Sequence, residues 1–262
     1  MQNPDMKKPS RTSTKLLQTH ILSGINELVR PWRNGLRNDF ENIPLKEMFC
    51  RIEGNFKPGR PLENLSKQNW RLDEQPILSE ESTSKEKILE KRIAALLKPG
   101  WVNQVPTASG YCGSGGRKRS IDLVCRSNDS TFIFYELKVL PESGDVFDAT
   151  IELLGYGLLY IYSRGLVAYK DCPLMKAKTV HLKVLGTWDY YKQTSPSMQF
   201  QDAISLNLSQ FAFARVSGCE MDFGFSTFPQ NFIPKDYVSA VTDQEDDRRI
   251  LSAVEGIHPC FG

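Results

Sequence analysis

Two apolar runs decide the fold: Ile121-Asp122-Leu123-Val124-Cys125 and Thr131-Phe132-Ile133-Phe134-Tyr135-Glu136-Leu137-Lys138-Val139. Both are rich in β-branched and aromatic residues, and the polar sequence Ser-Asn-Asp-Ser at 127–130 lies between them. This pattern predicts a β-hairpin. A loop over residues 128–130 would set residue 127 opposite residue 131, and that register places Asp122 opposite Glu136.

Three charged side chains should share one face of this hairpin. Opposed residues of an antiparallel pair lie on the same face, as do residues two apart on one strand, so Asp122, Glu136 and Lys138 project together. Glu136 lies within an otherwise apolar strand, where an unpaired charge is costly and a divalent cation is one standard partner for two carboxylates. The competing interpretation is a half-exposed hairpin whose polar face carries ordinary surface charges.

The composition is that of a globular protein. The chain has 262 residues, of which 40% are hydrophobic and 24% charged, and it carries a net charge of +2, which excludes a uniformly basic coat. Six cysteines without a Cys-x-x-Cys pair, together with only three histidines, argue against a structural zinc site and favour reduced thiols, with Cys125 buried. The longest apolar stretch, Leu153–Tyr162, is too short for a bilayer, so we expect a soluble, cytoplasmic protein without membrane contact.

Further elements follow from periodicity and from breaker residues. Seven phenylalanines between residues 200 and 232 suggest strands and core packing, with an aromatic platform for stacking bases as the alternative. The expected order is a polar tail at 1–14, a helix at 15–30 stopped by Pro31, irregular structure to residue 80, a helix at 85–97, a strand at 101–105, the hairpin, a helix at 146–163 and a strand at 178–186.

Two charged segments flank the hairpin in sequence. Glu86 and Glu90 lie one turn apart, near the edge of the apolar stripe of the 85–97 helix, where a solvated helix face is the competing interpretation. A glycine-rich stretch at 110–116 leads into Arg117-Lys118-Arg119, but it lacks the Gly-Lys-Ser/Thr ending of a nucleotide P-loop. We interpret it as a basic loop able to follow a phosphate backbone, or alternatively as a solvated turn.

The order of these elements resembles the PD-(D/E)XK nuclease superfamily over residues 85–186. The segments that carry the resemblance are Ile-Asp122-Leu-Val, Phe-Ile-Phe-Tyr-Glu136-Leu-Lys138 and Asp148-Ala-Thr-Ile-Glu152-Leu-Leu-Gly-Tyr156. The third is similar to the branch whose motif is Ala-x-x-Gln-Leu-x-x-Tyr. Glu152 departs from it by standing where that branch carries glutamine.

The resemblance implies an α/β fold with a restriction-endonuclease-like core, in which helices flank a central mixed β-sheet. The expected organisation is a disordered tail at 1–14, an N-terminal helix and irregular arm at 15–80, the nuclease core at 81–190 and a C-terminal elaboration packed on the core at 191–262.

The implied function is metal-dependent hydrolysis of phosphodiester bonds in nucleic acid, with DNA as the expected substrate. Asp122, Glu136 and the Leu137 carbonyl would bind Mg²⁺ or Mn²⁺, and Lys138 would orient or help deprotonate the attacking water and offset charge at the phosphate. Glu90, or failing that Glu86, would reach the site through a metal-bound water. Glu152 and Tyr156 would play supporting roles, and Arg117, Lys118 and Arg119 would contact nucleic acid.

A homodimer is an open expectation, because many double-strand cutters pair two such sites. Two alternatives to an active nuclease also stay open. One is a catalytically inactive module of the same fold that binds or senses nucleic acid. The other is an unrelated α/β domain whose hairpin charges are surface decoration.

Overall fold

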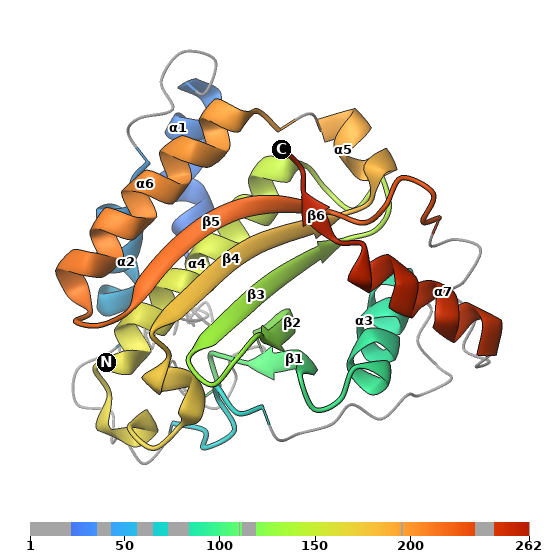
Figure 1. Ribbon diagram of the computed structural model, residues 1–262. Coiled ribbons are helices and arrows are strands. Elements are labelled where there is room, and N and C mark those ends of the chain that lie inside the picture. Colours follow the sequence, from blue (N-terminus) through green and yellow to red (C-terminus); the bar gives the residue numbers. More distant parts are fainter. Residues whose placement is uncertain are drawn as a thin grey trace, which may run out of the picture.

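A six-stranded mixed sheet forms the centre of the molecule (Figure 1). The computed structural model describes residues 22–35, 43–56, 65–72, 84–109, 111, 119–194, 196–233 and 244–261. The first and third strands are each antiparallel to the second, which lies between them, the third to fifth are parallel, and the sixth is antiparallel to the fifth. In spatial and chain order the strands are β1 (Trp101–Pro106), β2 (Ser120–Arg126), β3 (Thr131–Lys138), β4 (Thr179–Gly186), β5 (Glu220–Thr227) and β6 (His258–Pro259).

The predicted order of helix, three strands, helix and strand over residues 85–186 is confirmed, as are the α/β class and the mixed sheet. Helix α4 connects β3 to the parallel strand β4, and the Asp145 side chain caps its first turn by accepting from the Asp148 amide. The helices are α1 (Ile25–Gly35), α2 (Leu45–Asn55), α3 (Lys85–Leu96), α4 (Val146–Arg164), α5 (Trp188–Thr194), α6 (Met198–Arg215) and α7 (Gln244–Glu255), with short 3-10 helices at Val167–Tyr169 and Pro173–Lys176.

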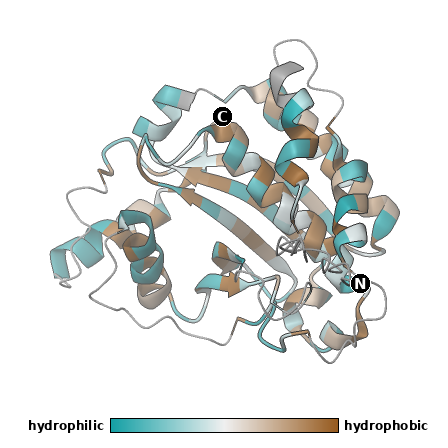
Figure 2. Cartoon of the chain, turned by 180° about the vertical axis from the view of Figure 1, so that it is seen from behind, coloured by the Kyte–Doolittle hydropathy of each residue, from teal (hydrophilic) through white to brown (hydrophobic). Residues whose placement is uncertain are grey.

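The sheet separates two apolar layers. Helices α1, α2, α4 and α6 pack on one face in the larger cluster, and α3 and α7 pack in a smaller cluster on the other face. Figure 2 shows apolar residues concentrated on the strands, whereas the surface helix α7 is largely hydrophilic. The hairpin alternates between the two layers: Val124 and Phe134 belong to the larger cluster, Leu123 and Tyr135 to the smaller.

The N-terminal predictions need two corrections. The first helix does not stop at Pro31: α1 spans Ile25–Gly35 with the proline inside it, and the predicted residues 15–21 lie outside the described chain. The supposedly irregular segment at 31–80 contains α2, which buries Met48, Phe49 and Ile52 against the larger cluster. Their i, i+1, i+4 spacing is helical, and the surrounding prolines concealed it.

The phenylalanine-rich segment at 200–232, for which strands were predicted, contains a helix as well as a strand. Its first half is helix α6, whose buried residues Phe200, Ile204, Leu208 and Ala212 recur every fourth position. Its second half contains β5, which joins β4 in parallel. Residues 191–262 therefore contribute two strands to the central sheet.

Helix α6 lies along the outer edge of β5 (Figure 1). The Phe223 amide donates to Ser205 Oγ at 3.3 Å, and the Phe225 amide donates to Gln201 Oε1 at 2.8 Å. Strand β6 pairs with β5 only at Ser226 and Thr227. Side chains of a helix thus satisfy edge amides that would otherwise lack partners.

Candidate active site

The hairpin has the predicted register. Leu123 pairs with Tyr135, and the next position along the ladder sets Asp122 opposite Glu136. Asp122 Oδ2 accepts a hydrogen bond from the Leu137 amide at 2.9 Å, and Lys138 Nζ lies 2.8 Å from Glu136 Oε1. The structure therefore brings the two carboxylates and the ammonium group together at one end of the hairpin.

Helix α3 adds a third carboxylate through a glutamine that sequence reasoning missed. Gln104 Nε2 donates to Glu90 Oε2 at 2.6 Å and lies 3.4 Å from Asp122 Oδ1. Ser120 Oγ donates to Gln104 Oε1 at 2.7 Å and so fixes the orientation of the amide. Gln104 also has a left-handed backbone, with φ of 51°, which is costly for a residue with a side chain and is typical of functional sites.

The two acids of α3 have different positions. Glu86 accepts a hydrogen bond from the Val139 amide at 3.1 Å, just beyond the end of β3, whereas Glu90 is linked to Asp122 through Gln104. Glu90 is only 2% exposed, so the alternative of a solvated helix face does not hold for this residue. Of the two candidates, Glu90 is the one tied to the hairpin carboxylates.

The carboxyl groups are difficult to ionise together. Burial, and then the charge of Asp122, raises the pKa of Glu90 to about 9 against the opposing hydrogen bond from Gln104. Burial raises the pKa of Asp122 to about 6, although the Leu137 amide and Lys138 favour its charged form. The pKa of Glu136, which is 3% exposed, is held well above its usual value by burial and by Asp122.

The pKa of Lys138 shows the effect of the surrounding carboxyl groups. Burial by itself would lower the pKa of this lysine, but the charge and hydrogen bond of Glu136, followed by the charges of Asp122 and Glu86, raise it above its ordinary value. The carboxyl groups around Lys138 thus outweigh the effect of burial and favour its ammonium form.

Residues 148–156 of α4, which carry the third motif of the resemblance, face the same group of carboxylates. Glu152 Oε1 lies 3.1 Å from Arg119 Nη1 and accepts from Tyr156 Oη at 3.2 Å. Its charge raises the pKa of both Asp122 and Glu136, and after burial it is the main cause of the raised pKa of Tyr156. Of the predicted basic loop only Arg119 is described, because Arg117 and Lys118 lie outside the described residues.

Several observations bear on a metal ion. Within the described ranges, no three His, Cys, Asp or Glu side chains gather in a way that could hold one. A metal ion beside Asp122 and Glu136 would therefore also need main-chain oxygen or water as ligands. The N–H and C=O of one strand residue point to the same neighbouring strand, and the Leu137 amide faces Asp122, so the Leu137 carbonyl faces that side as well.

Two further expectations concern the thiol of Cys125 and membrane-spanning helices. Cys125 is half-buried, and burial raises the pKa of its thiol to about 11, which keeps it neutral. None of the helices in the described part of the chain is both long and apolar enough to cross a membrane.

No protein-family model, curated protein or solved structure matches this chain. Its function is therefore inferred from the geometry and charge of the site itself.

Proposed function

We propose that the chain is a metal-dependent nuclease of the PD-(D/E)XK type that hydrolyses phosphodiester bonds of nucleic acid, with DNA as the expected substrate. The observation that carries this proposal is the meeting of Asp122, Glu136 and Lys138 at one end of the hairpin, where Lys138 Nζ lies 2.8 Å from Glu136 Oε1. A homodimer stays a prediction, to be checked by light scattering.

The donor set suits a hard cation. Mg²⁺ keeps several waters in most protein sites and takes one or two carboxylates, so Asp122, Glu136 and the Leu137 carbonyl are a sufficient protein contribution. A divalent cation would favour the ionised forms of these carboxyl groups, whose pKa values are raised by burial and by one another. When bound, Mg²⁺ or Mn²⁺ would supply Lewis acidity toward the phosphate and a lowered pKa for water.

The chain's own residues have separate tasks. Lys138 is held as an ammonium group beside Glu136, which supports charge compensation at the phosphate and orientation of the attacking water rather than proton abstraction. The Leu137 amide fixes one oxygen of Asp122, and Gln104 lies near the other while it holds Glu90. Glu90 and Gln104 are thus positioning residues.

A cleavage panel tests this proposal. Labelled single- and double-stranded DNA and RNA are incubated with Mg²⁺ or Mn²⁺ and with Asp122→Ala, Glu136→Ala or Lys138→Ala. Each variant should lose cleavage and keep its fold. Asp129→Ala is the matched control, because Asp129 lies in the turn of the same hairpin with its side chain 99% exposed. A site variant that retains near-wild-type rates with unchanged thermal stability would show that the site is wrongly assigned.

A nucleic-acid-binding or sensing module without cleavage is the second candidate, and the absence of a three-side-chain metal cluster among the described residues favours it. Calorimetric titration of Mn²⁺ into wild type and Glu136→Ala separates the two. The nuclease requires metal binding that Glu136→Ala loses, whereas the module would bind nucleic acid without a metal.

A further inference from the structure

Helix α3 contacts the candidate site on one side and helix α7 on another. Glu90 Oε2 accepts from Gln104 Nε2 at 2.6 Å, and two positions later Arg92 Nη2 lies 2.6 Å from Asp247 Oδ1. Residues two apart on an α-helix project about 200° from each other, so these two contacts lie on nearly opposite sides of α3. The helix that carries Glu90 is thereby tied to α7, which lies beside it (Figure 1).

The cation of this ion pair is buried. The Arg92 side chain is only 3% exposed, whereas the side chains of Asp246 and Asp247 are 15% and 29% exposed. Asp246 Oδ2 lies 3.6 Å from Arg92 Nη1, so the guanidinium group faces two carboxylates in the first turn of α7. Buried ion pairs contribute little net stability compared with apolar residues of similar volume, but they require a defined geometry. Orientation of α3 is therefore the more specific contribution of this pair.

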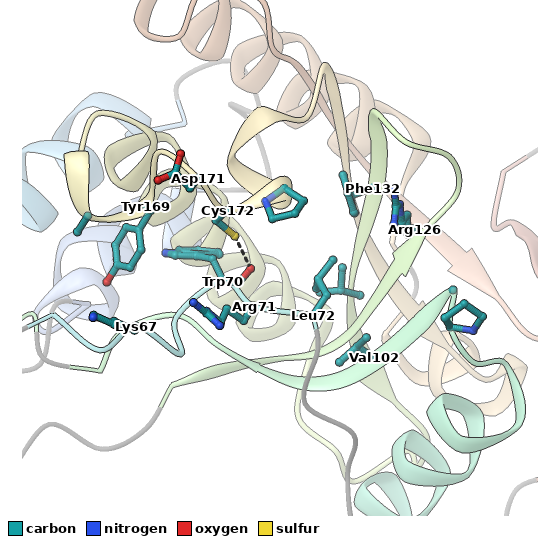
Figure 3. A pocket seen from close by; sticks show the side chains of 15 residues that line it. Lys67, Trp70, Arg71, Leu72, Val102, Arg126, Phe132, Tyr169, Asp171 and Cys172 are labelled. Carbon is teal, nitrogen blue, oxygen red and sulfur yellow. Dashed lines mark hydrogen bonds between the residues drawn. The ribbon is translucent and has the colours of Figure 1, made fainter.

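The other contacts of α3 constrain its second half less. Apolar residues of α3 and α7 belong to the smaller cluster, and apolar contacts have no preferred direction. Glu86 makes a directional contact with the Val139 amide, but it lies in the first turn. Beyond Leu97 the chain turns into β1, and Pro99 and Gly100 of this turn border a cavity of about 690 Å³ (Figure 3). A filled core would hold the turn more tightly.

We propose that Arg92, Asp246 and Asp247 are positioning residues of the candidate active site, because their ion pair sets the rotation of α3 and keeps Glu90 against Gln104. A rotation that withdraws Glu90 from Gln104 also turns Arg92, on the other side of the helix, away from α7. Gln104 lies near a hairpin carboxylate as well, so the position of α7 affects the hairpin through three side chains. The expected effect on cleavage rests on the proposed nuclease, whereas the effect on the contact between Glu90 and Gln104 does not.

Nuclear magnetic resonance of the Gln104 side-chain amide tests this contact in the metal-free protein. Asp246→Asn with Asp247→Asn keeps the shapes of the side chains and removes their charges. In this double variant the Gln104 Nε2 resonances should shift toward those of Glu90→Ala. Asp222→Asn is the matched control, because it removes a carboxylate from ion pairs with residues of β4, and it should leave the Gln104 resonances as in wild type.

Cleavage kinetics with Mg²⁺ measure the effect on the proposed reaction. The double variant should lower kcat by about tenfold to 100-fold and keep KM within about twofold of wild type, because the ion pair acts on the geometry of the site and not on the binding of the strand. Asp222→Asn should leave both constants unchanged.

A third variant separates positioning from folding. Removing one partner of a buried ion pair destabilises a protein, whereas apolar replacement of the whole pair is often neutral. Arg92→Met, added to the double variant, should therefore recover thermal stability and still lack the wild-type Gln104 resonances and kcat.

The positioning role is refuted if the double variant keeps the wild-type Gln104 resonances, or if adding Arg92→Met restores both the resonances and kcat. Unchanged kcat of the double variant, measured beside a wild type that cleaves, would refute the effect on catalysis and leave the nuclease intact. A wild type that does not cleave would refute the nuclease instead, and the Gln104 resonances would still decide whether α7 positions Glu90.

Discussion

Replacement of Glu90 by glutamine should stabilise the metal-free protein, and by more at pH 8 than at pH 6. The folded-state pKa of Glu90 is about 9, above the ordinary value of 4.5, so the folded chain holds this proton more tightly than the unfolded chain. Its stabilising contribution is complete below pH 4.5 and is lost as pH rises toward 9. Between pH 6 and pH 8 the free energy of unfolding of the wild type should fall, relative to that of Glu90→Gln, by about 1.36 kcal/mol per pH unit. Over these two units the difference reaches up to about 2.7 kcal/mol.

Glutamine is neutral at every pH and has the shape of protonated glutamate, so it can still accept from Gln104. Urea unfolding followed by circular dichroism at pH 6, 7 and 8 with EDTA gives the free energy of unfolding of both proteins. The advantage of Glu90→Gln should grow across this range. Glu86→Gln, one turn earlier on α3, should keep most of the wild-type pH dependence, because Glu90 is still present and burial and Asp122 do more than Glu86 to raise its pKa. An advantage that is equal at pH 6 and pH 8 would refute the raised pKa of Glu90.

Three further predictions concern other parts of the chain. Glu152→Gln, which restores the residue of the resembling motif, should keep cleavage within about tenfold of wild type, and complete loss would mean that this carboxylate is a metal ligand. Replacing Arg117, Lys118 and Arg119 together by serine should flatten the slope of log affinity against log salt by up to about three units, whereas unchanged slope and affinity would move the binding surface elsewhere. Gly157→Ala should lower the free energy of unfolding by about 1–3 kcal/mol, since its Cβ would meet Leu182 Cδ1 at 2.5 Å. Gly54→Ala, with no atom within 4 Å of the new Cβ, should leave denaturant unfolding unchanged or slightly stabilised.

The hairpin and its charged face were predictable because their determinants are local. A polar turn between two β-forming runs sets the register, and a register shift of one residue would turn the apolar side chains to the wrong face. The observed pairing of Leu123 with Tyr135 follows from that constraint. Helix α4 and strand β4 were predictable for the same reason, since each carries its own periodicity and breakers.

The parts that sequence reasoning missed depend on tertiary contacts. Gln104 is a neutral side chain in a short strand, and only its contacts with Glu90 and Ser120 give it a role. The choice between Glu86 and Glu90 depends on the rotation of α3 against the sheet, which a one-turn spacing does not encode. Trp70 carries no sequence signal for a left-handed backbone, because its neighbours in space, Pro106 and Cys172, come much later in the chain.

The contact of α6 with β5 has a consequence for how the protein behaves at high concentration. An uncovered parallel strand is a template on which another molecule can add a strand of its own, and addition can then continue into an aggregate. Gln201 and Ser205 occupy the β5 amides from the side and deny that template to other molecules. These two polar residues, far from any proposed chemistry, therefore help to set the concentration at which the chain can be handled and stored.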